Sequence, residues 1–335
     1  MARGYYEGLI NNEHYQNTWK DWLVEVQYSK ICWFDLLINN HEQVNTRKLI
    51  VDELVALKKE VESNLEKRFV YFICSRKRIR FNPKKKVKYG FFDGSIKIQL
   101  LIGKDKKPRN IKFYIVSNET QEIITPKVEL DERFITIHDA GDNQHVFFVH
   151  DFLQTFNINL NFTSDVHYVG YTKNPESRPT NGSHAGLTET LCNLSMDDND
   201  LLIYFNLFKV IARTDEMARG VTMVIPNSMT DEIDVDTEGR IIEKCFIEYF
   251  NSRSQNKNRT KEHDELRKNI FKLKYDHRIR SLQFYYEIDG DCDYFTLGSS
   301  SISPSRCHMF TIVSDENDFK VKTGSDIYEN LFGTI

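Results

Sequence analysis

The chain has 335 residues, of which 40% are hydrophobic and 13% aromatic, enough to fill the cores of two or three domains. Its formal net charge of −4 argues against binding nucleic acid through the whole surface, so any polyanion site must be a local patch. The six cysteines form no CxxC pair and have no histidine at ligand spacing, so neither a zinc site nor a disulfide framework is indicated. Because we find no signal peptide and no long apolar run, we expect a cytoplasmic protein that does not enter a membrane.

Residues 1–66 are predicted to be a helical N-terminal region. Apolar side chains recur there at alternating spacings of three and four residues, at Ile50, Leu54, Leu57, Val61 and Leu65. Such an amphipathic helix needs a partner, which the aromatic-rich segment before it supplies within the same chain. A homodimer interface is the alternative.

Residues 67–150 are predicted to form a β-rich module. Short runs of strand-forming residues alternate there with turn signals such as Asp93-Gly94. The expected strands are 69–74, 87–92, 95–102, 111–116, 134–137 and 146–150.

The β-rich module also carries the densest positive charge in the chain. Eight of the thirteen residues from Arg76 to Lys88 are basic: Arg76, Lys77, Arg78, Arg80, Lys84, Lys85, Lys86 and Lys88. With Phe81 and Tyr89 interleaved, this stretch is typical of a surface that tracks phosphates, so we predict a nucleic-acid-binding patch. A solvated hairpin without a partner is the alternative interpretation.

Residues 151–280 are predicted to form an α/β core, and residues 281–335 a C-terminal β segment. A helix is expected near 150–156. The nearly continuous apolar run 201–212 is typical of a central strand that is buried on both faces. The whole chain is therefore assigned to the α+β class.

A further helix is predicted within 241–256. Lys244, Glu248 and Asn251 share one stripe of this helix, which is its natural solvent face. Glu243 aligns instead with the apolar side chains of the helix. Its carboxylate should therefore need a cation, an arginine or a metal as partner.

A short strand over 167–172 breaks at a turn that leads to Arg178. Strand alternation places Tyr168, Gly170 and Thr172 on one face and Tyr171 on the other. A glycine between two tyrosines leaves room beside the strand, where we expect a ligand's backbone or phosphate to approach.

Taken together, these residues resemble the second half of the signature of the GIY-YIG nuclease family. The matching residues are Tyr168-Val169-Gly170, Thr172, Arg178 and His184, followed by the helix residues Glu243, Phe246-Ile247 and Asn256. The resemblance covers roughly 160–275. The first half, Gly-Ile-Tyr, is not found in the stretch before Tyr168, where Phe156-Asn157-Ile158 stands instead.

The resemblance implies a metal-dependent endonuclease that hydrolyses phosphodiester bonds. In that interpretation Arg178 binds phosphate, while Glu243, supported by Asn256, holds one Mg²⁺ or Mn²⁺. The candidates for the general base are Tyr168 and His184 first, then His167 and Tyr171. DNA is the expected substrate, with RNA left open, and restriction or defence against foreign DNA is the expected role.

Two other interpretations remain open at this point. The chain could be a non-catalytic nucleic-acid-binding protein that keeps this fold. It could also be a structural or signalling protein in which the signature is coincidental.

Overall fold

The computed structural model describes residues 3–41, 44–64, 68–117, 120–139, 141, 143–180, 185–216, 220–251, 259–288, 290 and 292–323. Helices and mixed sheets together confirm the α+β class. Across the described ranges, no helix is both long and apolar enough to cross a membrane.

A central sheet organises the fold, with nine strands in the described part of the chain. In spatial order they are β16 (Leu297–Gly298), β12 (Ser164–Thr172), β2 (Phe69–Lys77), β13 (Asn199–Thr214), β1 (Lys20–Trp33), β15 (Ile279–Glu287), β17 (Cys307–Ser314) and β18 (Phe319–Thr323), with β14 (Val224–Pro226) paired to β13. The predicted central strand is confirmed, because most of β13 is buried. Strands β1 and β15 are parallel neighbours although they lie near opposite ends of the sequence.

The prediction that residues 1–66 are helical is wrong for β1. Trp22 and Val24 are buried there, and the residues between and beside them are partly exposed, which is the two-residue period of a strand. Aromatic and β-branched side chains favour this conformation. The predicted C-terminal segment likewise joins the central sheet through β15, β17 and β18, so the sheet crosses the boundaries of the predicted regions.

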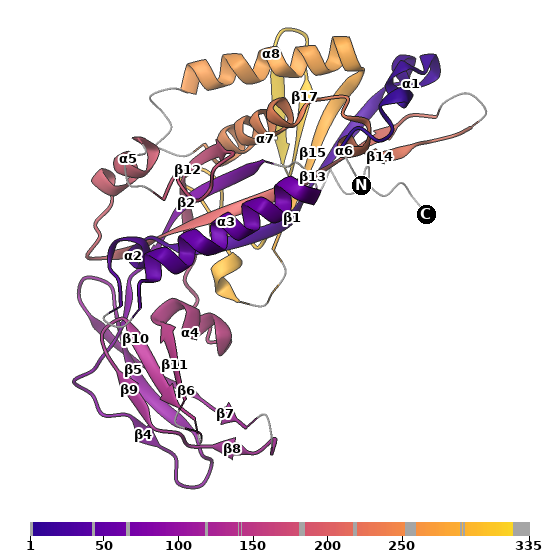
Figure 1. The fold of residues 1–335 in the computed structure, drawn as a ribbon. Helices are drawn as coiled ribbons and strands as arrows, with labels where there is room; N and C mark the ends of the chain where they lie inside the picture. The colour runs from indigo at the N-terminus through magenta and orange to yellow at the C-terminus, as the bar shows by residue number, and fades with distance from the viewer. Residues whose placement is uncertain are drawn as a thin grey trace.

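Helices cover both faces of the sheet (Figure 1). One face packs against α2 (Phe34–Ile38), α3 (Thr46–Asn64) and α5 (Ala185–Asn193), and the other against α7 (Val235–Phe250) and α8 (Arg259–His277). The amphipathic helix is confirmed as α3, with Leu54 and Val61 buried against the chain's own sheet; Leu65 lies outside the described residues. Short helices near the N-terminus and before α7 are η1 (Glu7–Asn11), α1 (Glu13–Asn17) and α6 (Asn227–Thr230).

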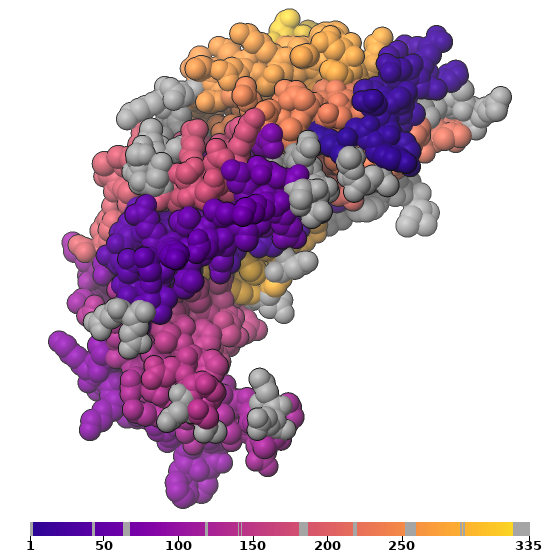
Figure 2. Space-filling view, in the orientation of Figure 1, coloured from indigo at the N-terminus to yellow at the C-terminus, as the bar shows by residue number. Residues whose placement is uncertain are grey.

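The β-rich module is inserted between β2 and β12, which are neighbours in the sheet. It contains β3 (Ile79–Phe81), β4 (Lys88–Tyr89), β5 (Ile96–Ile102), β6 (Lys107–Phe113), β7 (Ile115–Val116), β8 (Ile123–Ile124), β9 (Val128–Leu130), β10 (Phe134–His138), β11 (Gln144–Phe148) and the predicted helix α4 (Val149–Thr155). Figure 2 shows this module projecting from the body of the molecule, and Figure 1 places β4 at its far end. A short η3 (Asp293–Phe295) precedes β16.

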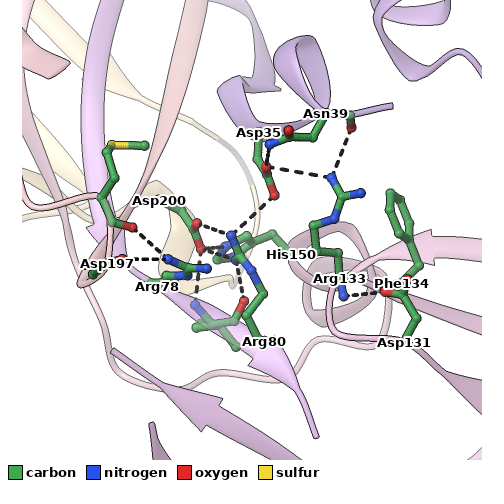
Figure 3. Close-up of polar contacts among 12 residues, drawn as sticks. Asp35, Asn39, Arg78, Arg80, Asp131, Arg133, Phe134, His150, Asp197 and Asp200 are labelled. Atoms are coloured by element: carbon green, nitrogen blue, oxygen red, sulfur yellow. Dashed lines mark hydrogen bonds and ion pairs between the residues drawn. The ribbon is translucent and has the colours of Figure 1, made fainter. Parts of the chain in front are cut away.

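A buried polar cluster joins the module to the central sheet (Figure 3). We call Asp35, Arg80, His150 and Asp200 the joint cluster. Asp200 accepts hydrogen bonds from His150 Nε2 and Arg80 Nη1, each at 2.8 Å. Burial would raise the pKa of Asp200, but these hydrogen bonds lower it to about 2. His150 stacks on Trp33 with a ring separation of 3.8 Å and is fully buried, so the cluster forms a structural joint between the module and the sheet.

Candidate functional site

The pairing of β12 with β2 brings two tyrosines together. Gly170 lies opposite Tyr71, and the rings of Tyr71 and Tyr168 are 6.1 Å apart. A Cβ atom on Gly170 would lie 2.3 Å from Cζ of Tyr71, so only glycine fits at this position. The expectation that Gly170 leaves room for a ligand is therefore wrong, since the Tyr71 ring fills that space.

The turn after β12 carries Arg178. Thr172 begins this turn by accepting a hydrogen bond on Oγ1 from the backbone N–H of Asn174, at 2.9 Å. Lys58 of α3 anchors the turn to that helix by donating a hydrogen bond to Asn174 Oδ1 at 2.6 Å. Arg178 itself is exposed, and its guanidinium hydrogen-bonds to the hydroxyl of Tyr71.

Glu243 approaches the same place from α7. Its carboxylate accepts a hydrogen bond from the backbone N–H of Tyr171. This N–H is accessible because β16 pairs only with Ser164 and Asp165 of β12, which leaves the later edge of β12 without a strand neighbour among the described residues. Tyr71, Tyr168, Arg178 and Glu243 interact electrostatically with one another, and we call these four residues the edge cluster.

Nearby positive charge compensates the Glu243 carboxylate of the edge cluster only in part. Burial raises the pKa of Glu243 to about 7; Lys244 and Arg178 oppose this shift, and Glu262 adds to it. Burial also raises the pKa of Tyr168 to about 12 and that of Tyr71 further still. Both tyrosines therefore keep their protons at neutral pH, and the half-buried Glu243 carboxylate would gain from an added cation.

This imbalance predicts that metal-free protein loses stability as the pH rises. The folded pKa of Glu243, about 7, lies above its ordinary value of 4.5. The contribution of protonated Glu243 to the free energy of unfolding is therefore complete below about pH 4.5 and is lost as the pH rises through 7. The loss is roughly 1–2 kcal/mol once solvent screening is allowed for. Urea unfolding in EDTA at pH 5 and pH 8 should show this loss in the wild type and not in Glu243→Gln. An identical pH dependence in both proteins would contradict it.

The predicted solvent face of the α7 helix is wrong at Lys244. This side chain is buried, because α8 lies over it and supplies Glu262 and Glu265 as ion-pair partners, the latter at 2.7 Å. Asn251 ends the helix as its C-cap in the left-handed conformation. Lys244 and Glu262 thus border the edge cluster, although the sequence did not single out either of them for this site.

Tyr171 and His167, the later candidates for the general base, each make a side-chain hydrogen bond to a residue outside the edge cluster. The Tyr171 hydroxyl donates to Asp236 at 2.7 Å, on the opposite face of β12 from Tyr168. His167 contacts Ser75 Oγ at 2.7 Å. His184 and Asn256 lie outside the described residues.

Tyr71 is the site residue that sequence reasoning missed. It occurs in Phe69-Val70-Tyr71, a buried run that was predicted only as a strand of the β-rich module. Residues 78–163 separate Tyr71 from its strand partner, so no local spacing connects the two tyrosines. The sequence signal that could have identified Tyr71 is a buried strand that carries a tyrosine and is followed by a long insertion.

The predicted basic patch divides into two parts. The prediction is wrong for Arg76 and Arg80, which are held in internal ion pairs with Asp293 and Asp200. Lys77 forms an ion pair with Asp198 at 2.5 Å, and Arg78 forms one with Asp197 at 3.6 Å. The remaining lysines, Lys84, Lys85, Lys86 and Lys88, are exposed.

The edge cluster has few of the side chains that usually hold a metal ion. Among the described residues, no group of three or more His, Cys, Asp or Glu side chains is placed to hold one. The cluster instead offers a single carboxylate, Glu243, whose pKa is raised chiefly by burial. Mg²⁺ commonly uses one or two carboxylates and keeps several waters, so this donor set fits a hydrated Mg²⁺ or Mn²⁺.

Comparisons with protein-family models, curated proteins and solved structures found no match to this chain.

Proposed function

We propose that the chain is a metal-dependent endonuclease that hydrolyses phosphodiester bonds of DNA at the edge cluster. The observation that carries this proposal is convergence: β2, β12, the turn before α5, and α7 each contribute one polar side chain to the same place. An arginine, a carboxylate and two protonated tyrosines suit a phosphate that gains negative charge during hydrolysis.

The second tyrosine strengthens the resemblance to the GIY-YIG nuclease family. The stretch just before Tyr168 contains no Gly-Ile-Tyr, the first half of the signature. Tyr71 supplies a tyrosine opposite Gly170 on the adjacent strand, within Phe69-Val70-Tyr71 rather than Gly-Ile-Tyr. The paired tyrosines therefore support membership of a divergent branch.

Each residue of the edge cluster has a chemical role in this proposal. The Arg178 guanidinium forks onto two phosphate oxygens, and the Tyr71 hydroxyl orients it through their hydrogen bond. Glu243 would hold the metal ion, which supplies Lewis-acid stabilisation of the phosphate and the leaving oxygen. Tyr168 remains a candidate base together with His184; its pKa of about 12 requires a nearby cation before it can accept a proton at neutral pH.

The proposed biological role is restriction or another defence against foreign DNA. A non-catalytic nucleic-acid-binding protein is the second candidate, favoured by the exposed Lys84, Lys85, Lys86 and Lys88, which can contact phosphates without any reaction.

Plasmid cleavage tests this proposal directly. We expect the purified chain to nick supercoiled DNA in Mg²⁺ or Mn²⁺, and excess EDTA to abolish nicking while salt-dependent binding persists. Binding without cleavage across metals and substrates would select the non-catalytic candidate. Absence of both binding and cleavage would contradict both candidates.

A further inference from the structure

Two adjacent phenylalanines project into solvent from the turn between β4 and β5. Phe91 is 94% exposed and Phe92 98% exposed. Their rings meet edge to face at 5.2 Å, so each contacts mainly the other. An apolar pair presented so fully to water indicates a surface that another molecule covers.

The turn that carries these rings is held in one shape. The N–H of Gly90 donates to the carbonyl of Ser95 at 2.7 Å, and the buried Ser95 hydroxyl donates to Asp93 Oδ1 at 2.7 Å. A Cβ atom on Gly90 would lie 2.0 Å from Asp93 Oδ1, so glycine lets the Asp93 side chain fold back over the turn. The phenylalanines are thus presented on a preorganised turn, which lowers the entropic cost of binding.

A row of lysines lies beside the turn on the outer face of the module's four-stranded sheet. Lys97 is opposite Lys88 on one neighbouring strand and opposite Lys112 on the other. Like charges placed directly opposite one another are destabilising. Asp93 pairs with Lys112 at 2.8 Å, whereas Lys88 and Lys97 have no acidic partner within the described ranges. The row therefore retains positive charge that an anionic partner would neutralise.

Amide side chains continue the same face beyond the lysines. Gln99 lies opposite Asn110 and donates to its Oδ1 at 3.1 Å, and Asn82 donates to Gln99 Oε1 at 2.8 Å. A hollow on this face is lined by lysines together with Gln99 and Asn110. Amides in this hollow suit the hydrogen-bonding edges of bases and sugars, which a lipid surface lacks. The face therefore fits a polynucleotide better than a membrane.

We propose that Phe91 and Phe92 form a wedge that inserts between base pairs of duplex DNA while Lys88 and Lys97 contact the flanking phosphates. Apolar wedges that unstack a base step are an established way for proteins to bend and hold a duplex. This inference rests on the proposed function for the identity of the ligand, and it assigns substrate deformation to a part of the chain outside the edge cluster.

Substitution of the exposed pair tests the wedge. The Phe91→Ala, Phe92→Ala double variant of the full chain should bind a duplex containing 2-aminopurine at least tenfold more weakly in EDTA, because the stacking contacts of both rings are lost. The 2-aminopurine fluorescence rise that reports unstacking should disappear. The matched control is Tyr5→Ala, Tyr6→Ala, which removes another exposed edge-to-face pair and should change neither readout.

The lysine row has its own readout. Lys88→Gln, Lys97→Gln should reduce the slope of log affinity against log salt by about 2, because two phosphate contacts are lost. The phenylalanine variant should leave that slope unchanged.

The outcomes separate this inference from the proposed function. Wild-type protein that binds and cuts DNA, with the phenylalanine variant binding equally tightly and unstacking bases, would overturn the wedge alone. If the wild type binds anionic phospholipid vesicles and the phenylalanine variant does not, while both bind DNA equally, the wedge would be overturned in favour of a membrane-binding surface. Wild-type protein that neither cuts nor binds DNA would overturn the proposed function as well.

Discussion

Replacing Glu243 with glutamine is expected to abolish metal-dependent plasmid cleavage while leaving DNA binding intact. The carboxylate is the only group of the edge cluster suited to hold a divalent cation, and glutamine keeps its shape without its charge. Loss of Lewis-acid stabilisation worth several kcal/mol should slow nicking by at least about 10³-fold. The rate is measured on supercoiled plasmid in Mg²⁺ and Mn²⁺, and binding is measured by gel shift in EDTA.

Glu248→Gln is the matched control for that experiment. Glu248 lies on the same helix, α7, but it contacts His263 of α8 at 3.2 Å instead of joining the edge cluster. The plasmid nicking rate of the Glu248→Gln variant should stay within a few-fold of the wild-type rate. A Glu243→Gln variant that also stayed within tenfold would show that this carboxylate does not serve the reaction, and the proposed site would then be wrong.

Removing the Asp200 carboxylate should cost about 3–5 kcal/mol of unfolding free energy, the range typical of a broken buried ion pair. Asp200 is 3% exposed and bridges Arg80, His150 and the backbone N–H of Ile79. Asp200→Ala leaves those donors buried without their acceptor. Urea unfolding of the full chain at pH 7 measures the difference.

Asp197→Ala provides the comparison. Its side chain is 78% exposed and lies 3.6 Å from Arg78, so its removal should change the unfolding free energy by less than about 0.5 kcal/mol. Figure 3 shows Asp197 beside Arg78 and Asp200 beside Arg80. Similar small effects at Asp197 and Asp200 would mean that the joint cluster does not hold the module to the sheet.

Local sequence patterns predicted several elements well. The spacing of Leu54 and Val61 identified α3, and the long apolar run identified β13 as a central strand. The strand before Arg178 was also correctly placed as β12. These features depend on neighbours close in sequence, where side-chain period reports burial directly.

Long-range pairing could not be predicted in the same way. β1 was taken as part of a helical region because its aromatic residues suggested packing against a helix, whereas its neighbours are β13 and β15. Lys244 was placed on a solvent face because nothing local shows that α8 covers it. Tyr71 was missed because an inserted module separates the two tyrosine-bearing strands.

The position of β1 also has a consequence during synthesis on the ribosome. β1 is translated early, yet its antiparallel neighbour ends at Thr214 and its parallel neighbour at Glu287. Until those segments emerge, β1 presents two unpaired edges, which invite association with other nascent chains. We therefore expect newly made protein to depend on chaperones that shield strand edges until translation is nearly complete.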